Sequence, residues 1–201
     1  MKKTLAIILV LLLSISMLAG CGNSNSGGNS GTTESTLPAE TSAPESTTAG
    51  GVTGEIYSTG EFSVLIPDGW KAFPTYTNGD VNKPVTGRLS VFKGIEEIIG
   101  MRGGGPGFNV THYEKGKTVI LVSKDKFDDA VDLQPIALDN YTWEGLTGTY
   151  STMGPCVYAW TTPQETDVDK FEVYIWLTGQ GGEISFDDAD VQAILASITL
   201  E

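Results

Sequence analysis

The chain has few of the side chains that carry metal-dependent or nucleic-acid chemistry. Its 201 residues include one His, two Cys and 12 Lys or Arg against 25 Asp or Glu, for a net charge of -13. Cations must supply affinity for nucleic acid, so the acidic balance excludes nucleic acid as a principal partner and argues against a phosphate-binding protein. In contrast, four Trp, seven Tyr and seven Phe supply enough large side chains for a core, which excludes disorder of the whole chain.

Long apolar runs are also scarce, and the longest one lies at the start of the chain. Lys2 and Lys3 precede an apolar stretch over residues 5–18, which is interrupted by Ser14 and Ser16. A transmembrane helix needs about 20 apolar residues, so the stretch is short for an uncleaved membrane anchor. A positive start followed by an apolar segment of this length predicts a secretory signal peptide over residues 1–20.

The residues that close this segment are Leu18-Ala19-Gly20-Cys21, and they resemble the lipobox of bacterial lipoproteins. The resemblance implies that the signal is cut before Cys21, whose thiol receives a diacylglyceryl group. Two acyl chains would anchor the protein by on the order of 20 kcal/mol. The expected location is therefore the cell membrane, with the protein lipid-anchored and facing the extracytoplasmic side.

Residues 21–54 consist mostly of Gly, Ser, Thr, Asn, Ala, Pro and Glu, with Leu37 and Val52 as the large apolar residues. Such a composition cannot bury enough apolar surface to offset chain entropy. The segment after Cys21 is therefore predicted to be a disordered tether, and a glycosylated stalk or an interaction segment is the alternative.

The remaining part, residues 55–201, is predicted to be one extracytoplasmic domain of short strands. Apolar residues alternate in six runs, which end at turns more often than at helical patterns. The sheet is therefore expected to have about six strands and to be mostly antiparallel. The runs are 61–66, 88–93, 108–113, 143–150, 157–161 and 171–177.

Helical spacing predicts two helices and suggests a third. In 123–132, Phe127, Ala130 and Val131 are spaced for one helical face after a capping Ser123. A capping box at Ser185–Asp188 precedes an apolar stripe, which predicts a C-terminal helix. The apolar stripe of this C-terminal helix comprises Val191, Ile194, Leu195 and Ile198. A shorter third helix is indicated by Ile95, Ile98 and Ile99.

Two stretches, 62–70 near the start of the domain and 190–198 at its end, resemble those of PsbP-like domains. The resemblance implies an α+β fold, a three-layer α/β/α sandwich around the antiparallel sheet. Proteins of this superfamily mostly act as binding or assembly modules, and the resemblance carries no functional residue to this chain.

Motifs for chemistry are weak. Residues 113–118 end like a phosphate-binding loop, but Thr111 stands where that motif has its first Gly, so a hairpin turn is expected. The segment Gly100–Gly107 is either a mobile loop at a binding site or a plain connector. Acidic residues within 123–132 would form one helical face, where a solvated surface is favoured over a calcium site; they are Asp125, Asp128, Asp129 and Asp132. No metal and no cofactor is expected.

Cys156 and His112 are the residues that a nucleophilic enzyme would need. A small hydrolase would require them within about 3 to 4 Å of each other. His112 has no second His or Cys at the spacing of zinc ligands. Ordinary structural roles for both residues are favoured, and the protein is predicted not to be an enzyme.

Aromatic residues alternate on two of the predicted strands. If these strands are neighbours, Tyr158, Trp160, Tyr174 and Trp176 form one aromatic surface, to which Trp143 could add, that could stack a sugar or a peptide. In a three-layer fold a helix would cover this surface and make it part of the core. The four residues are the predicted ligand-binding set.

Together these observations predict a lipid-anchored extracytoplasmic protein that binds an envelope protein or an extracellular ligand. The hydrolase with Cys156 and His112 is the enzymatic alternative. A structural component of the envelope is the third.

Overall fold

The computed structural model describes residues 46–98, 104–151, 153–165 and 167–201. The predicted signal peptide, the lipobox with Cys21 and most of the predicted tether lie outside the described residues. Ile99 and the first part of the Gly100–Gly107 segment also lie outside them. In the described part, no helix has the length and apolar character to cross a membrane.

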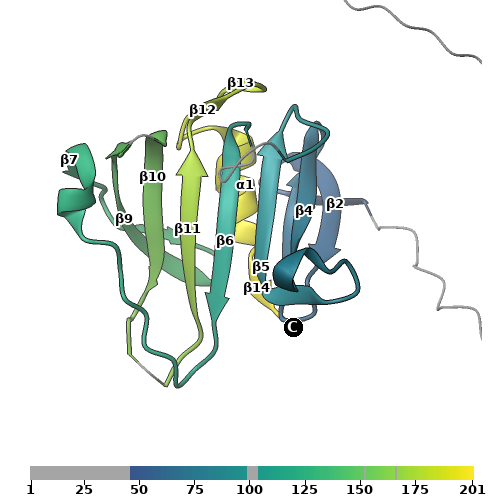
Figure 1. The fold of residues 1–201 in the computed structure, drawn as a ribbon, viewed down its shortest axis with the longest axis horizontal. Coiled ribbons are helices and arrows are strands. Elements are labelled where there is room, and N and C mark those ends of the chain that lie inside the picture. Colours follow the sequence, from purple (N-terminus) through teal and green to yellow (C-terminus); the bar gives the residue numbers. More distant parts are fainter. Residues whose placement is uncertain (1–45, 99–103, 152, 166) are drawn as a thin grey trace, which may run out of the picture. The chain divides into compact units, whose positions relative to one another are not determined.

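Strands make up most of the described chain (Figure 1). The elements are β1 (Ser46–Ala49), β2 (Val52–Ser58), β3 (Phe62–Pro67), β4 (Trp70–Tyr76), η1 (Thr77–Gly79), β5 (Pro84–Lys93), β6 (Gly107–Tyr113), η2 (Lys124–Lys126), β7 (Phe127–Asp132), β8 (Ile136–Leu138), β9 (Tyr141–Tyr150), β10 (Gly154–Thr162), β11 (Lys170–Trp176), β12 (Thr178–Gly179), β13 (Gly182–Glu183), α1 (Ala189–Ser197) and β14 (Thr199–Leu200).

All six predicted strands are present, and they belong to two sheets, both antiparallel. They correspond to β3, β5, β6, β9, β10 and β11. The large sheet has eight strands in the order β4-β5-β6-β11-β10-β9-β7, with β8 paired to β9. The sixth predicted strand, β3, belongs to a second sheet in the order β1-β2-β3-β14.

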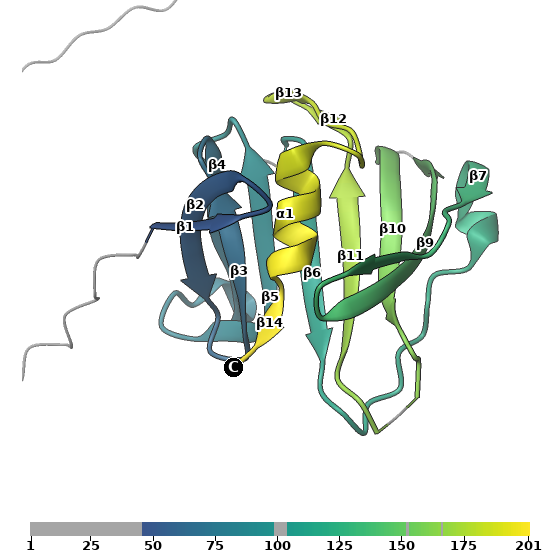
Figure 2. The same cartoon turned by 180° about the vertical axis from the view of Figure 1, so that it is seen from behind.

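The predicted three-layer α/β/α sandwich is wrong. The described residues contain one α-helix, α1, so helices cannot cover both faces of the large sheet. Figure 2 shows α1 lying on one face, beside β3 of the second sheet. We call this face of the large sheet the helix face and the opposite one the outer face.

The predicted C-terminal helix is confirmed, although it begins later than the capping box indicated. Asp188, rather than Ser185, is the N-cap, and the Asp188 carboxylate accepts a hydrogen bond of 2.9 Å from the Ser185 backbone N–H. The apolar stripe of the helix is fully buried against the helix face, where each such side chain stabilises the fold by about 1.5 to 3 kcal/mol. The core comprises Phe62, Val64, Leu89, Val91, Phe108, Val110, Phe171, Val173, Ile175, Val191, Ile194, Leu195 and Ile198.

The predicted helix over 123–132 is wrong, because a β-bulge imitates helical spacing. The segment forms the short η2 turn and then β7, which pairs with β9. The register shifts between Asp128 and Val131, and Asp129 has a φ of 54°. The extra residue of the bulge puts Phe127 and Ala130, three positions apart, into the same outer-face cluster.

The other helix indication, over the isoleucines 95–99, also fails in the described residues. The chain bends at Glu96 and Glu97, Ile95 is buried under the outer face, and Ile98 is exposed. Because residues 124–132 form η2 and β7 rather than an α-helix, Asp125, Asp128 and Asp132 share no helical face.

Regular structure begins before residue 55, within the range predicted to be tether. Strand β1 starts at Ser46 and β2 at Val52, and β2 pairs with β3 from Gly54 onward. A Cβ at Gly54 would lie 2.3 Å from the carbonyl oxygen of Ile66, so the close pairing of these strands requires glycine.

Candidate functional site

Strands β5 and β6 form a ladder over only half of β5. They pair from Phe92 and Gly107 to Arg88 and Thr111, and beyond this point no further pairs join them. A cavity of about 440 Å³ lies where the strands separate. Its walls come from Val85 to Arg88 of β5, Thr111 to Tyr113 of β6 and the turn that follows β6.

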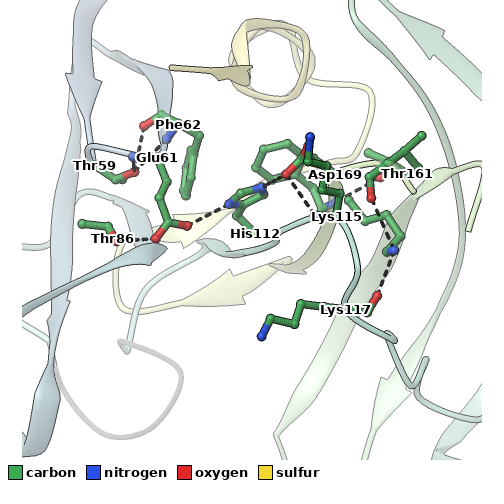
Figure 3. Close-up of polar contacts among 12 residues, drawn as sticks. Thr59, Glu61, Phe62, Thr86, His112, Lys115, Lys117, Thr161 and Asp169 are labelled. Carbon is green, nitrogen blue, oxygen red and sulfur yellow. Dashed lines mark hydrogen bonds and ion pairs between the residues drawn. The ribbon is translucent and has the colours of Figure 1, made fainter. Parts of the chain in front are cut away.

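Glu61 connects the two strands across this opening (Figure 3). The Thr86 hydroxyl on β5 donates a short hydrogen bond to Glu61 Oε1, and His112 Nδ1 on β6 lies 2.8 Å from Glu61 Oε2. The hydrogen bond from Thr86 is the largest cause that lowers the pKa of Glu61, and His112 adds to it. A Cβ at Gly87 would lie 3.0 Å from Glu61 Oε2, which explains a glycine inside β5.

His112 is held by a carboxylate at each ring nitrogen. Its Nε2 lies 3.1 Å from Asp169 Oδ1, an oxygen that also accepts the Lys115 backbone N–H at 3.2 Å. The His112 side chain is only 4% exposed and packs against the rings of Phe62 and Phe171. Each ring nitrogen thus has a polar contact with one carboxylate oxygen. His112 therefore joins β3, β6 and the start of β11 and has no free nitrogen for a substrate.

Cations without an acidic partner gather beside this network. Among the described residues, five lysines form ion pairs with carboxylates; they are Lys71, Lys83, Lys93, Lys124 and Lys126. Arg88, Lys115 and Lys117 form no such pair with any described carboxylate. Arg88 and Lys117 line the cavity. Lys115 lies in the turn that follows β6, between Glu114 and Lys117 in the sequence.

Lys170 fixes the loops next to the cavity. This lysine is 1% exposed, and its ammonium donates to the carbonyl oxygens of Lys117, Glu165 and Val168 at 3.0, 2.8 and 3.4 Å. The loop that follows β6 and the loop that precedes β11 are thereby tied to each other. Lys117 therefore has a fixed backbone position (Figure 3).

A buried carboxylate organises the outer face. Glu172 accepts hydrogen bonds from the hydroxyls of Tyr113 at 2.7 Å and Tyr158 at 2.5 Å. Burial is the largest cause, and Glu172 the next, that raises the pKa of Tyr113 to about 12. The same two causes raise the pKa of Tyr158. Arg88 acts in the opposite direction on Tyr113, which places its positive charge close to that hydroxyl.

The structure brings the four predicted aromatic residues together. Tyr158 and Tyr174 are cross-strand partners with ring centroids 4.8 Å apart. Trp160 contacts Tyr158 at 5.2 Å, and Trp176 stacks on Tyr174 at 5.6 Å. Trp143 is on the helix face and does not join them.

This aromatic cluster is covered by an irregular segment rather than by a helix. Leu121 and Val122 pack against it, and the Val122 N–H donates to the Tyr158 hydroxyl at 3.0 Å. Tyr158 and Trp176 are buried, whereas Trp160 and Tyr174 keep part of their surface exposed. The geometry is that of a core with two accessible edges, and a ligand-binding role of the cluster stays a prediction.

Cys156 and His112 are not brought together. Cys156 is opposite Trp176, which is opposite Gly107, whereas His112 is opposite Phe171 at the far end of β11. Five residues along a strand correspond to about 16 Å, and the two side chains point to opposite faces. Burial also raises the pKa of the Cys156 thiol to about 11, which keeps it protonated at neutral pH.

The other sequence features have plain structural outcomes. Residues 113–118 contain a turn in which the Lys117 N–H donates to the Glu114 carbonyl oxygen at 3.1 Å. The next strand, β7, pairs with β9 and not with β6, so the turn does not close a hairpin. The described end of the glycine-rich segment, Gly104 to Gly107, packs against Lys93, Ile95 and Gly179. Within the described residues, no cluster of His, Cys, Asp and Glu has a geometry that could hold a metal ion.

Most of this site could not be found from the sequence alone. Glu61, Arg88 and Asp169 are far apart in the chain and carry no motif. The one local signal is Gly87, directly before the predicted strand 88–93 and within β5, because a strand glycine often marks a close approach by another group. A scan against protein-family models gives no match for the chain, and a search of curated proteins gives none either.

Proposed function

We propose that the protein is a lipoprotein, anchored through Cys21 on the extracytoplasmic side of the cell membrane, whose domain is a binding module without catalytic chemistry. The cavity between β5 and β6 is its ligand site. One observation carries the proposal: the cavity of about 440 Å³ has two cations, Arg88 and Lys117, that no described carboxylate neutralises. This volume is in the usual range of about 300 to 1,000 Å³ for small-molecule sites.

The walls of the cavity favour binding over catalysis. Glu61 and His112 are the residues that a general acid or base would use, but each already accepts or donates at both of its polar atoms. Cys156, the thiol required by the hydrolase alternative, is buried far from His112. Other polar side chains of the lining, among them Arg88, Lys117 and Thr118, can recognise charge and hydrogen-bonding groups.

The binding part of the proposal is tested by thermal unfolding of the detergent-solubilised full chain with a panel of sugars, amino acids, organic acids and short peptides. A ligand at about 100 times its Kd adds roughly 2.7 kcal/mol, which raises the Tm of a domain of this size by several degrees. Thr118→Trp fills the cavity from its exposed rim and should abolish the shift. Thr142→Trp, at an exposed position of β9, is the matched control and should keep it. A shift that survives Thr118→Trp would contradict the proposed site.

The anchoring part has its own test. Cells that express the chain are labelled with a radioactive fatty acid and fractionated. The full chain should carry the label and sediment with membranes, and Cys21→Ser should lose the label. Label retained in Cys21→Ser would contradict lipidation at this residue.

A further inference from the structure

We propose that the ligand of this cavity carries an anionic oxygen group, a carboxylate or a phosphate, and that Arg88 and Lys117 bind it. This inference rests on the proposed function and names the chemistry of its ligand. The starting point is the distribution of charge. Residues 55–201 contain 10 basic and 22 acidic side chains, so a cation placed at random would meet a carboxylate.

Five described lysines do meet one, at 2.8 to 3.8 Å. Lys170 is satisfied by three carbonyl oxygens. Of the nine cations among the described residues, the three that remain are Arg88, Lys115 and Lys117, and all lie at the opening between β5 and β6 or in the turn beside it. These three cations form no ion pair with a described carboxylate although the chain is acidic, and its net charge limits only sequence-independent binding to long polyanions.

The carboxylates next to the cavity are already occupied. Both oxygens of Glu61 are bound by Thr86 and His112, and Asp169 is bound by His112 and the Lys115 backbone. Glu172 is held by two tyrosine hydroxyls under the outer face. Glu114 is the one acidic side chain of the lining that has no such contact among the described residues, so it is the one lining carboxylate whose oxygens are not already bound.

The backbone of both cations is fixed, whereas their side chains are exposed. The carbonyl oxygen of Lys117 accepts a hydrogen bond from the buried Lys170 ammonium. Arg88 is the last residue of the β5–β6 ladder, and its planar guanidinium suits a bidentate contact with a carboxylate or phosphate. A second cavity of about 320 Å³ adjoins the first, and Arg88 and Thr111 line both, so the rest of a ligand has room on either side of the guanidinium.

The test is calorimetric titration of the detergent-solubilised full chain with inorganic phosphate, glycerol phosphate and succinate, with glycerol as the neutral reference. The variant is Arg88→Gln combined with Lys117→Gln. The matched control is Lys124→Gln combined with Lys126→Gln, which removes the same charge from two exposed lysines paired elsewhere. At least one anionic probe should bind, with the Kd raised at least tenfold in the first pair and less than threefold in the second. The comparison of phosphate with succinate shows which anionic group is recognised.

Three results would overturn the inference. Equal weakening in both double variants would show a general charge effect. Failure of all three anions to bind would remove the anion site. A neutral ligand whose binding is blocked by Thr118→Trp, yet is unchanged by the loss of Arg88 and Lys117, would leave the binding function in place and refute the anionic ligand alone.

Discussion

The two faces of the large sheet are both covered, but by different chemistry. On the helix face, α1 and β3 close an apolar core in which Phe62, Ile194 and Leu195 are fully buried. On the outer face, an irregular segment covers rings whose hydroxyls converge on Glu172. Apolar packing of α1 and β3 thus covers the helix face, whereas hydrogen bonds help to hold the irregular segment against the outer face. The candidate site lies where β5 and β6 separate, next to the hydrogen-bonded residues of the outer face.

The largest loss in the free energy of unfolding is expected for a substitution on the helix face. Ile194→Ala removes a fully buried side chain of α1 and should lower the free energy of unfolding by about 2 to 5 kcal/mol. Ile56→Ala, at a position that is 40% exposed, should cost less than about 1 kcal/mol. Urea unfolding of both variants measures the difference. Equal costs would show that α1 does not seal this core.

The outer face should respond to the loss of a single acceptor. Glu172→Met keeps the size of the side chain but leaves the buried Tyr158 hydroxyl without its carboxylate, at a cost of about 1 to 3 kcal/mol. Glu144→Met, at an exposed position of β9, two strands from β11, is the control and should change stability by less than about 0.5 kcal/mol. If both variants unfold at the same urea concentration, the tyrosine network contributes nothing to this face.

The sequence determined the faces of the strands well, because the period of two survives in β11. Phe171, Val173 and Ile175 alternate with Tyr174 and Trp176, and each set is on the predicted side. What covers a face depends on distant segments. The bulge in β7 produced a helical spacing where the chain continues the sheet. The three-layer fold, which the resemblance to PsbP-like domains implied, fails because the one described α-helix covers one face only.

The candidate site was less accessible to prediction. His112 was noted as a lone histidine, but its two carboxylates come from residues 51 and 57 positions away, and only strand register brings them within hydrogen-bonding distance. Arg88 and Lys117 are ordinary surface cations in the sequence. Their meaning appears only when every described lysine outside this opening and the turn beside it proves to have a partner.

The opening between β5 and β6 should make its own contribution to acid sensitivity. The pKa of Glu61 is lowered in the folded state, mainly by the Thr86 hydroxyl, so its carboxylate stabilises the fold above its unfolded pKa of about 4.3. This contribution is lost as the pH falls through the lower folded pKa. Glu61→Gln should therefore cost about 1 kcal/mol at pH 7 and progressively less below about pH 4, where wild-type Glu61 is protonated too.

Urea unfolding across this pH range measures that effect. Glu97→Gln, at an exposed carboxylate in the 94–98 bend, supplies the control and should follow the wild type at every pH. A constant difference between Glu61→Gln and the wild type from pH 7 to pH 3 would mean that the carboxylate charge does not matter at the opening.

The smallest effect, no reaction at all, is expected at Cys156, the thiol that the hydrolase alternative requires. A catalytic thiol needs an exposed, deprotonated sulfur, whereas Cys156 is fully buried with a pKa raised to about 11. In full-length Cys21→Ser, Cys156 is the only thiol. Iodoacetamide at pH 8 should leave the native protein unmodified over hours and alkylate it completely in urea, as intact mass would show. Rapid alkylation of the native chain would instead mean that the outer face opens readily at β10, because His112 lies too far away to activate the sulfur. The thiol is therefore a probe of how firmly the irregular segment closes that face, the property in which it differs from the face under α1.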